Sequence, residues 1–122
     1  MFIRHWRART SVEQEARYLA AVRETVLPHL RGSPGYQRSS FLRRALDDGS
    51  VEILVLTSWA SREAAAGLSD DDGGVAWLPD EIARTLDDHD EHVFLYETML
   101  EDDPDDWPPS PRGGIRGAEP DR

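Results

Sequence analysis

Four kinds of side chain in this sequence are suited to chemistry on a small molecule: arginine, histidine, tryptophan and tyrosine. Arg4 and His5 are adjacent near the start of the chain. An arginine stabilises a developing anion, a histidine accepts a proton near neutral pH, and aromatic rings wall a dry pocket. We therefore predict that Arg4 and His5 are catalytic. Ligand binding is predicted for the aromatic residues Trp6, Tyr36, Trp59 and Trp77.

Strand periodicity divides the first of these residues between two faces. Successive side chains of a β-strand point to opposite sides, so Arg4 and Trp6 share one face. His5 takes the other face, between Ile3 and Arg7. Neither face is purely apolar, and the sequence leaves open which one turns toward the helices. Three plainer roles stay open as well: the tryptophans as packing in the core or a dimer interface, Arg4 as half of an ion pair, and His5 as a structural side chain of its strand.

Composition excludes several kinds of site and partner. The 122 residues contain no cysteine, lysine or asparagine. The absence of cysteine excludes disulfides, thiolate metal ligands and a cysteine nucleophile. The net charge is −10, and nineteen of the 24 carboxylates lie in residues 51–122. Such acidity disfavours nucleic acid and anionic membranes, because phosphate binding depends on clustered basic charge. We expect a cytoplasmic protein, since neither a signal peptide nor an apolar run of about 20 residues is evident.

Two acidic segments resemble metal sites only in composition. Residues 87–92 hold two histidines among carboxylates, but a loop that leads into a strand does not fix them as a helix would. Residues 69–74 lack the bidentate glutamate and the alternating ligands of a calcium loop. We interpret both segments as solvated, and we predict no metal and no cofactor.

The spacing of apolar residues predicts the elements that position these groups. Pro28 is expected to kink or end the first helix, and Pro79 falls inside the third. The chain after residue 100 is rich in proline, glycine and carboxylates, so we divide it into a folded domain, 1–100, and an acidic tail, 101–122, that we expect to be disordered. Strands are predicted at 1–9, 36–45, 51–59 and 92–100, and helices at 12–30, 62–68 and 75–86.

The order βαββαβ predicts an α+β fold, a ferredoxin-like antiparallel sheet with its helices on one face. Residues 53–56 are Ile-Leu-Val-Leu, a strand that is apolar on both sides, and residues 93–96 repeat this pattern. A strand with no polar face must be covered twice. About 100 residues contain too little helix to cover the second face, which then requires another subunit or a ligand cavity. We expect a homodimer around a pocket.

Three segments resemble the antibiotic biosynthesis monooxygenase domain family. They are residues 3–10 (IRHWRART), 26–36 (VLPHLRGSPGY) and 54–61 (LVLTSWAS), the last followed by Glu63 and Ala64. The resemblance covers residues 1–100 and implies a dimeric α/β barrel of two face-packed sheets. Some members of that family oxygenate electron-rich aromatic compounds to quinones without a cofactor. Others degrade haem with an Asn, a Trp and a His; only the Trp has a match here, Trp59, so we do not expect haem degradation.

The resemblance implies an oxygenase. Oxygenation without metal or flavin needs a substrate that becomes an enolate or phenolate, in a dry pocket with a base and a positive group. The protein would then be a cofactor-independent monooxygenase of a small aromatic or polyketide-like compound, with Arg4 and His5 as the positive group and the base. The alternatives are a non-catalytic dimer that binds a small molecule in the same pocket, and a structural dimer without a ligand.

Overall fold

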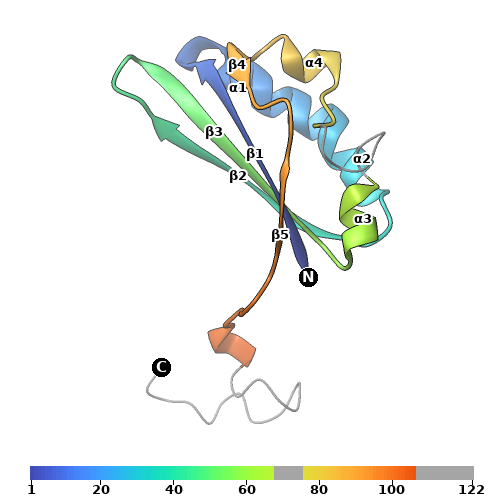
Figure 1. Cartoon of the computed structure of the whole chain (residues 1–122). Helices are drawn as coiled ribbons and strands as arrows, with labels where there is room; N and C mark the ends of the chain where they lie inside the picture. Colours follow the sequence, from blue (N-terminus) through green and yellow to red (C-terminus); the bar gives the residue numbers. More distant parts are fainter. Residues whose placement is uncertain (68–75, 107–122) are drawn as a thin grey trace.

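The computed structural model describes residues 1–67 and 76–106 (Figure 1). Most of the predicted acidic tail, residues 107–122, lies outside the described residues, and so does the segment 68–75. None of the helices in the described ranges is long and apolar enough to cross a membrane. The elements are β1 (Phe2–Ser11), α1 (Val12–Ala21), the π-helical turn η1 (Val22–Val26), α2 (Leu27–Arg31), β2 (Tyr36–Ala45), β3 (Ser50–Trp59), α3 (Arg62–Ala66), α4 (Asp80–Ala83), β4 (Asp88–His89), β5 (Phe94–Glu97) and the 3-10 turn η2 (Pro104–Asp106).

The strands form one antiparallel sheet in the order β2-β3-β1-β4, with β5 also paired to β1. β4 pairs with the end of β1, where His89 lies opposite Ala8, and β5 pairs with its beginning, where Phe94 lies opposite His5. These two short strands together take the place of the single fourth strand predicted at residues 92–100. The order is ferredoxin-like, so the predicted α+β class is confirmed.

All four helices lie on one side of the sheet (Figure 1). β1 shows this in its burial, because Arg4, Trp6 and Ala8 are buried whereas Arg7 and Arg9 are exposed. The even-numbered side chains of β1 therefore face the helices, and the odd-numbered ones face away. This answers the question of direction that the sequence left open.

One helical stretch runs from α1 through η1 to α2. Ser11 caps its start, since the Ser11 hydroxyl accepts a hydrogen bond from the Gln14 amide at 3.2 Å. Pro28 does not end it, because the helix continues to Arg31. The π-helical turn Val22–Val26 lies immediately ahead of this proline. Its wider ring relieves the clash that a proline makes with the preceding turn of an α-helix.

The helix predicted at residues 75–86 was wrong in extent. Only Asp80–Ala83 form helix α4, and Pro79 caps that helix in an extended conformation, with φ −60° and ψ 148°. A proline disfavours helical geometry in the residue before it, which keeps residues 76–78 out of the helix. The segment 76–79 is instead an irregular strip that covers part of the sheet.

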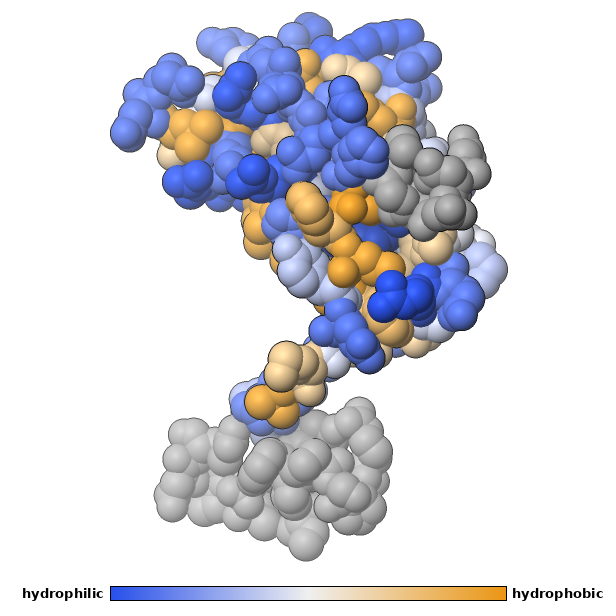
Figure 2. Space-filling view, in the orientation of Figure 1, coloured by the Kyte–Doolittle hydropathy of each residue, from blue (hydrophilic) through white to orange (hydrophobic). Residues whose placement is uncertain are grey.

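The face of the sheet without helices has an apolar centre, which we call the open face. Ile53 and Val55 of β3 pack toward the helices, and the intervening Leu54 and Leu56 point to the open face. The prediction that this strand is apolar on both sides is therefore confirmed. Figure 2 shows hydrophobic side chains gathered in the middle of the molecule, around the place that β5 occupies in Figure 1. Exposed apolar residues of the open face are Leu42 (47%), Phe94 (57%) and Tyr96 (53%).

Candidate functional site

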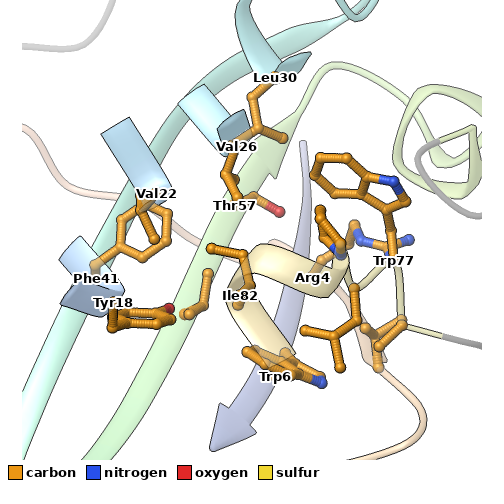
Figure 3. A pocket seen from close by; sticks show the side chains of 15 residues that line it. Arg4, Trp6, Tyr18, Val22, Val26, Leu30, Phe41, Thr57, Trp77 and Ile82 are labelled. Atoms are coloured by element: carbon orange, nitrogen blue, oxygen red, sulfur yellow. The ribbon is translucent and has the colours of Figure 1, made fainter. Parts of the chain in front are cut away.

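A cavity lies between the helices and the sheet, and we call it the helix-side cavity (Figure 3). Its volume is about 70 Å³, and the atom-free space that includes its open mouth is about 570 Å³. Binding pockets for small molecules span roughly 300–1,000 Å³, so the cavity itself is smaller than such a pocket, and a ligand of two or three rings would extend into the open mouth. The floor comes from Arg4, Trp6, Phe41, Val55 and Thr57 of the sheet, and the walls come from Tyr18, Val22, Val26, Leu30, Ala76, Trp77, Leu78, Pro79, Ile82 and Val93.

The long helical stretch shapes one wall through a regular spacing of four residues. Tyr18, Val22, Val26 and Leu30 all line the cavity. In an α-helix four residues overshoot a full turn by about 40°, so such a row drifts around the axis. The π-helical turn between Val22 and Val26 is wider than an α-turn and offsets part of this drift. The π-helical turn thereby keeps the row directed at the sheet.

Arg4 brings positive charge to this apolar space. Its side chain is only 4% exposed, and its guanidinium Nη1 donates a hydrogen bond of 2.7 Å to the Ala65 carbonyl in α3. Burial lowers the pKa of Arg4 to about 10, which leaves the guanidinium charged at neutral pH. Of the described lining residues, Arg4 is the only one with an ionised side chain. A positive charge in such surroundings interacts strongly with a nearby anion, because little water screens it.

Two of the predicted aromatic residues line the cavity beside Arg4. Trp6 is 9% exposed, and its indole nitrogen donates a 2.6 Å hydrogen bond to the Asp90 carbonyl, which fixes the ring. Trp77 stacks on His29, with ring centroids 4.2 Å apart and planes inclined by 22°. The structure therefore brings Arg4, Trp6 and Trp77 together at one end of the cavity (Figure 3).

The other two predicted aromatic residues lie next to the cavity rather than in its lining. Tyr36 and Trp59 contact each other edge to face, with centroids 5.5 Å apart, in a separate core cluster around Leu30. Trp59 is fully buried, and its indole nitrogen donates a 2.8 Å hydrogen bond to the Thr57 hydroxyl. Trp59 thus positions Thr57, whose side chain does line the cavity.

His5 lies on the open face, on the opposite side of the sheet from Arg4. Its ring is 6.2 Å from the Phe94 ring and 5.8 Å from the Tyr96 ring. The His5 Nδ1 atom is buried and has no hydrogen-bond partner among the described residues. The structure therefore does not bring the two predicted catalytic residues together. Within residues 1–67 and 76–106, the lining of the cavity contains no histidine or carboxylate.

Sequence reasoning did not single out Tyr18. Its side chain is 3% exposed and forms one end of the cavity. The available signal was the four-residue spacing from Tyr18 to Val22 and Val26, which identifies a buried helix face but not a cavity. As for metals, no group of three His, Cys, Asp or Glu side chains in the described ranges is placed to hold an ion.

Comparison with known proteins was made by sequence and by fold. No family model and no curated protein matches the sequence. Solved structures do match the fold. A candidate antibiotic biosynthesis monooxygenase from Bacillus cereus superposes with a TM-score of 0.55 at 16% identity, over 84% of this chain and 96% of the other. This chain has an antibiotic biosynthesis monooxygenase-like fold.

Two further solved structures share this antibiotic biosynthesis monooxygenase-like fold, and both are described as candidate antibiotic biosynthesis monooxygenases. The one from Nitrosomonas europaea has a TM-score of 0.54 at 13% identity, over 84% of this chain and 93% of the other. The one from Deinococcus radiodurans has a TM-score of 0.52 at 16% identity, over 84% and 97%. The resemblance predicted from residues 3–10, 26–36 and 54–61 is therefore confirmed at the level of the fold.

Proposed function

We propose that the protein is a cofactor-independent monooxygenase that binds a small aromatic or polyketide-like compound in the helix-side cavity. One observation carries the proposal, the buried guanidinium of Arg4 in an otherwise apolar space walled by Trp6 and Trp77. Preorganised positive charge in a site that excludes water stabilises an anion far better than the same charge does in water. The likeness in fold to candidate antibiotic biosynthesis monooxygenases supports the same reading.

The reaction can be written for anthrone, a compound whose enolate is an aromatic oxyanion. The CH₂ carbon loses a proton, the resulting oxyanion lies beside Arg4, and the carbanionic carbon bonds to molecular oxygen. Loss of water then gives anthraquinone. One oxygen atom becomes the new carbonyl, and the other leaves as water with the two hydrogens of the CH₂ group. The positive charge of Arg4 lowers the pKa of the bound substrate, so the first proton can pass to solvent through the cavity mouth.

The test is oxygen uptake with anthrone in the absence of any added cofactor, with anthraquinone measured as product. Arg4→Met should lower kcat/KM by about a hundredfold or more, since loss of one group that stabilises an oxyanion typically costs that much. Arg4→Lys keeps a positive charge and should recover part of the loss. The matched control is Arg9→Met, which removes an exposed arginine from the same strand. Tight binding of anthrone with no oxygen uptake would contradict the oxygenase.

A second candidate function is binding without turnover. It is favoured by the position of His5 on the other side of the sheet, which leaves the described lining of the cavity without a histidine or carboxylate base. A binding protein would be stabilised against heat by ligand and would yield the ligand unchanged. Aerobic incubation followed by recovery of the compound distinguishes this function from oxygenation.

We also propose that the protein is a cytoplasmic homodimer, a dimeric α/β barrel in which two open faces pack together. The open face has apolar side chains on both sides of β1, Leu54 and Leu56 on β3 and the exposed rings of Phe94 and Tyr96 on β5. An exposed apolar sheet face of this kind is typical of a buried interface. Because His5 lies there too, its buried Nδ1 belongs to the proposed interface rather than to the cavity.

Charge at the two ends of the open face supports a second copy of this chain as the occupant. At one end Arg7 and Arg44 flank Glu52, with N–O distances of 3.7 and 2.9 Å. At the other end Arg38 pairs with Glu101 at 3.3 Å, and the acidic segment 101–105 leaves the sheet. A two-fold axis that brings opposite ends together would set this acidic segment of one subunit beside the arginines of the other.

A further inference from the structure

The helix-side cavity has a second polar end, which is formed by Tyr18. Tyr18 projects from α1 and lies on the Phe41 side of the cavity, whereas Arg4 lies on the Trp77 side (Figure 3). The hydroxyl of Tyr18 points from its ring toward the interior of the cavity (Figure 3). Between the two ends lies the apolar side chain of Ile82 (Figure 3). The cavity is therefore apolar in its middle and polar at both ends.

The Tyr18 hydroxyl has no hydrogen-bond partner in the part of the chain that the structure describes, although the side chain is 97% buried, with only 3% exposed. Among the described residues, His5 Nδ1 is the only fully enclosed side-chain polar atom without a partner, so the Tyr18 hydroxyl reaches the accessible space of the cavity, where a ligand or water can pair with it. Burial also raises the pKa of Tyr18 above its usual value, so the hydroxyl stays protonated. It is thus a hydrogen-bond donor directed at whatever fills the cavity.

The Arg4 end also offers donors. Thr57 lies opposite Arg4 in the pairing of β1 with β3. The Thr57 hydroxyl already accepts a hydrogen bond from the Trp59 indole, so its own hydrogen remains for donation. A guanidinium and a hydroxyl hydrogen at one end, and a phenol hydrogen at the other, call for a ligand that presents acceptors at both of its ends.

We propose that the ligand is a flat apolar compound with oxygen substituents on two opposite edges, and that Tyr18 selects for the oxygen farther from Arg4. An anionic or carbonyl oxygen would bind at Arg4 and Thr57, and a hydroxyl or carbonyl oxygen would accept the hydrogen bond of Tyr18. This inference rests on the proposed use of the cavity as a ligand site, and it does not depend on oxygenation. It makes Tyr18 a residue that determines specificity.

The test compares three probes of one size under nitrogen, so that no oxygenation intervenes. Naphthalene carries no oxygen, 1-naphthol carries one, and 1,5-dihydroxynaphthalene carries two on opposite edges. Calorimetric titration of the wild type should give the tightest binding for the diol, by about three- to tenfold over 1-naphthol, which is the range of one net hydrogen bond. Tyr18→Phe should remove this advantage and leave the affinity for 1-naphthol unchanged.

The matched control is Tyr36→Phe. Tyr36 has its hydroxyl in a 2.8 Å hydrogen bond with Ser39, outside the cavity lining, so this variant should keep the preference for the diol. A second readout uses the ligand-free protein. Because Tyr18→Phe keeps the ring and removes a hydroxyl that makes no hydrogen bond to the described residues, its Tm should stay close to that of the wild type, whereas Tyr36→Phe should lower it.

Three results would overturn the inference: equal affinity of the wild type for diol and 1-naphthol, a Tyr18→Phe variant that binds both naphthols equally less tightly, and a Tm of ligand-free Tyr18→Phe well below that of the wild type. Failure of oxygenation is distinguishable from these. If the diol binds with the predicted dependence on Tyr18 and no quinone forms when air is admitted, the inference stands and the oxygenase is refuted.

Discussion

Gly35 is the position at which the backbone geometry makes the sharpest prediction. It connects the turn after α2 to β2 and has φ +82°, a conformation that side chains other than glycine's disfavour. A Cβ atom added there would lie 2.4 Å from the Cβ of Ala64 in α3. The Gly35 carbonyl also accepts a 2.8 Å hydrogen bond from the Ala60 amide. Gly35→Ala therefore forces β2 and α3 apart where they touch.

The magnitude follows from two terms. The positive φ costs about 1–2 kcal/mol for an alanine, and forcing an extra methyl into a packed contact costs about 1–3 kcal/mol. We expect Gly35→Ala to reduce the free energy of unfolding by about 2–5 kcal/mol. Gly49 is the matched control, since it has φ +87° with nothing within 4 Å of an added Cβ. Gly49→Ala should therefore lose only the first term, about 1–2 kcal/mol.

Urea denaturation followed by tryptophan fluorescence measures both variants, and two further variants, Ala64→Gly alone and Ala64→Gly together with Gly35→Ala, isolate the clash. In Gly35→Ala combined with Ala64→Gly the two methyl groups no longer meet, so the double-mutant cycle should give a favourable coupling of about 1–3 kcal/mol. Because α3 also supplies the Ala65 carbonyl that holds Arg4, Gly35→Ala should weaken ligand binding as well. Equal losses for Gly35→Ala and Gly49→Ala, or a coupling near zero, would refute the reasoning.

Three more predictions address the open face, the β2–β3 hairpin and the core. In sedimentation at micromolar concentration the wild type should have the mass of the proposed dimer, and Leu56→Glu, which places a carboxylate on the open face, should have that of a monomer; equal masses for the two proteins would contradict the proposed interface. Hydrogen bonds from the Ser50 hydroxyl and amide lower the pKa of the Asp48 carboxyl in the folded protein. The ionised carboxylate therefore stabilises the fold at pH values above the pKa that Asp48 has in the unfolded chain. This stabilisation is lost as the pH falls through the lower pKa of the folded protein. Asp48→Asn should therefore lose less Tm than the wild type between pH 7 and pH 3, and an identical loss would refute this account. Trp59→Phe removes a fully buried indole and its hydrogen bond to Thr57, so chemical denaturation should show a loss of about 2 kcal/mol, against which a loss near zero would count.

The hairpin of β2 and β3 was predictable because its signals are local. The strand at Tyr36–Ala45 was predicted with the observed bounds, and β3 begins one residue earlier than expected. Gly49 supplies the positive φ of the turn between them. The helix at 75–86 failed for the opposite reason. Apolar residues on both sides of Pro79 all pack against the core, so their spacing imitates a helix in a segment where Pro79 prevents one.

For the candidate site, the sequence predicted which side chains of the first strand share a face, but not whether that face turns toward the helices. Period two correctly put Arg4 and Trp6 on one face. The direction of that face was not predictable, because a buried arginine is tolerated only where a distant segment supplies acceptors, here the Ala65 carbonyl of α3. Because neighbouring side chains of a strand point to opposite faces, His5 points away from the cavity when Arg4 points into it. Tyr18 escaped notice because a tyrosine in a buried helical row is indistinguishable from core packing until the cavity is seen.

The π-helical turn Val22–Val26 has a consequence for how this architecture can change. Such a turn holds one residue more than the regular spiral, so losing a single residue there would restore an unbroken α-helix. Because the wider turn absorbs the extra residue locally, the helix beyond the deletion would keep nearly the same orientation, and α2 would still present Leu30 to the cavity. The shape of the cavity wall can thus be altered at this one turn by a one-residue change in chain length, independently of the strand that carries Arg4 and Trp6.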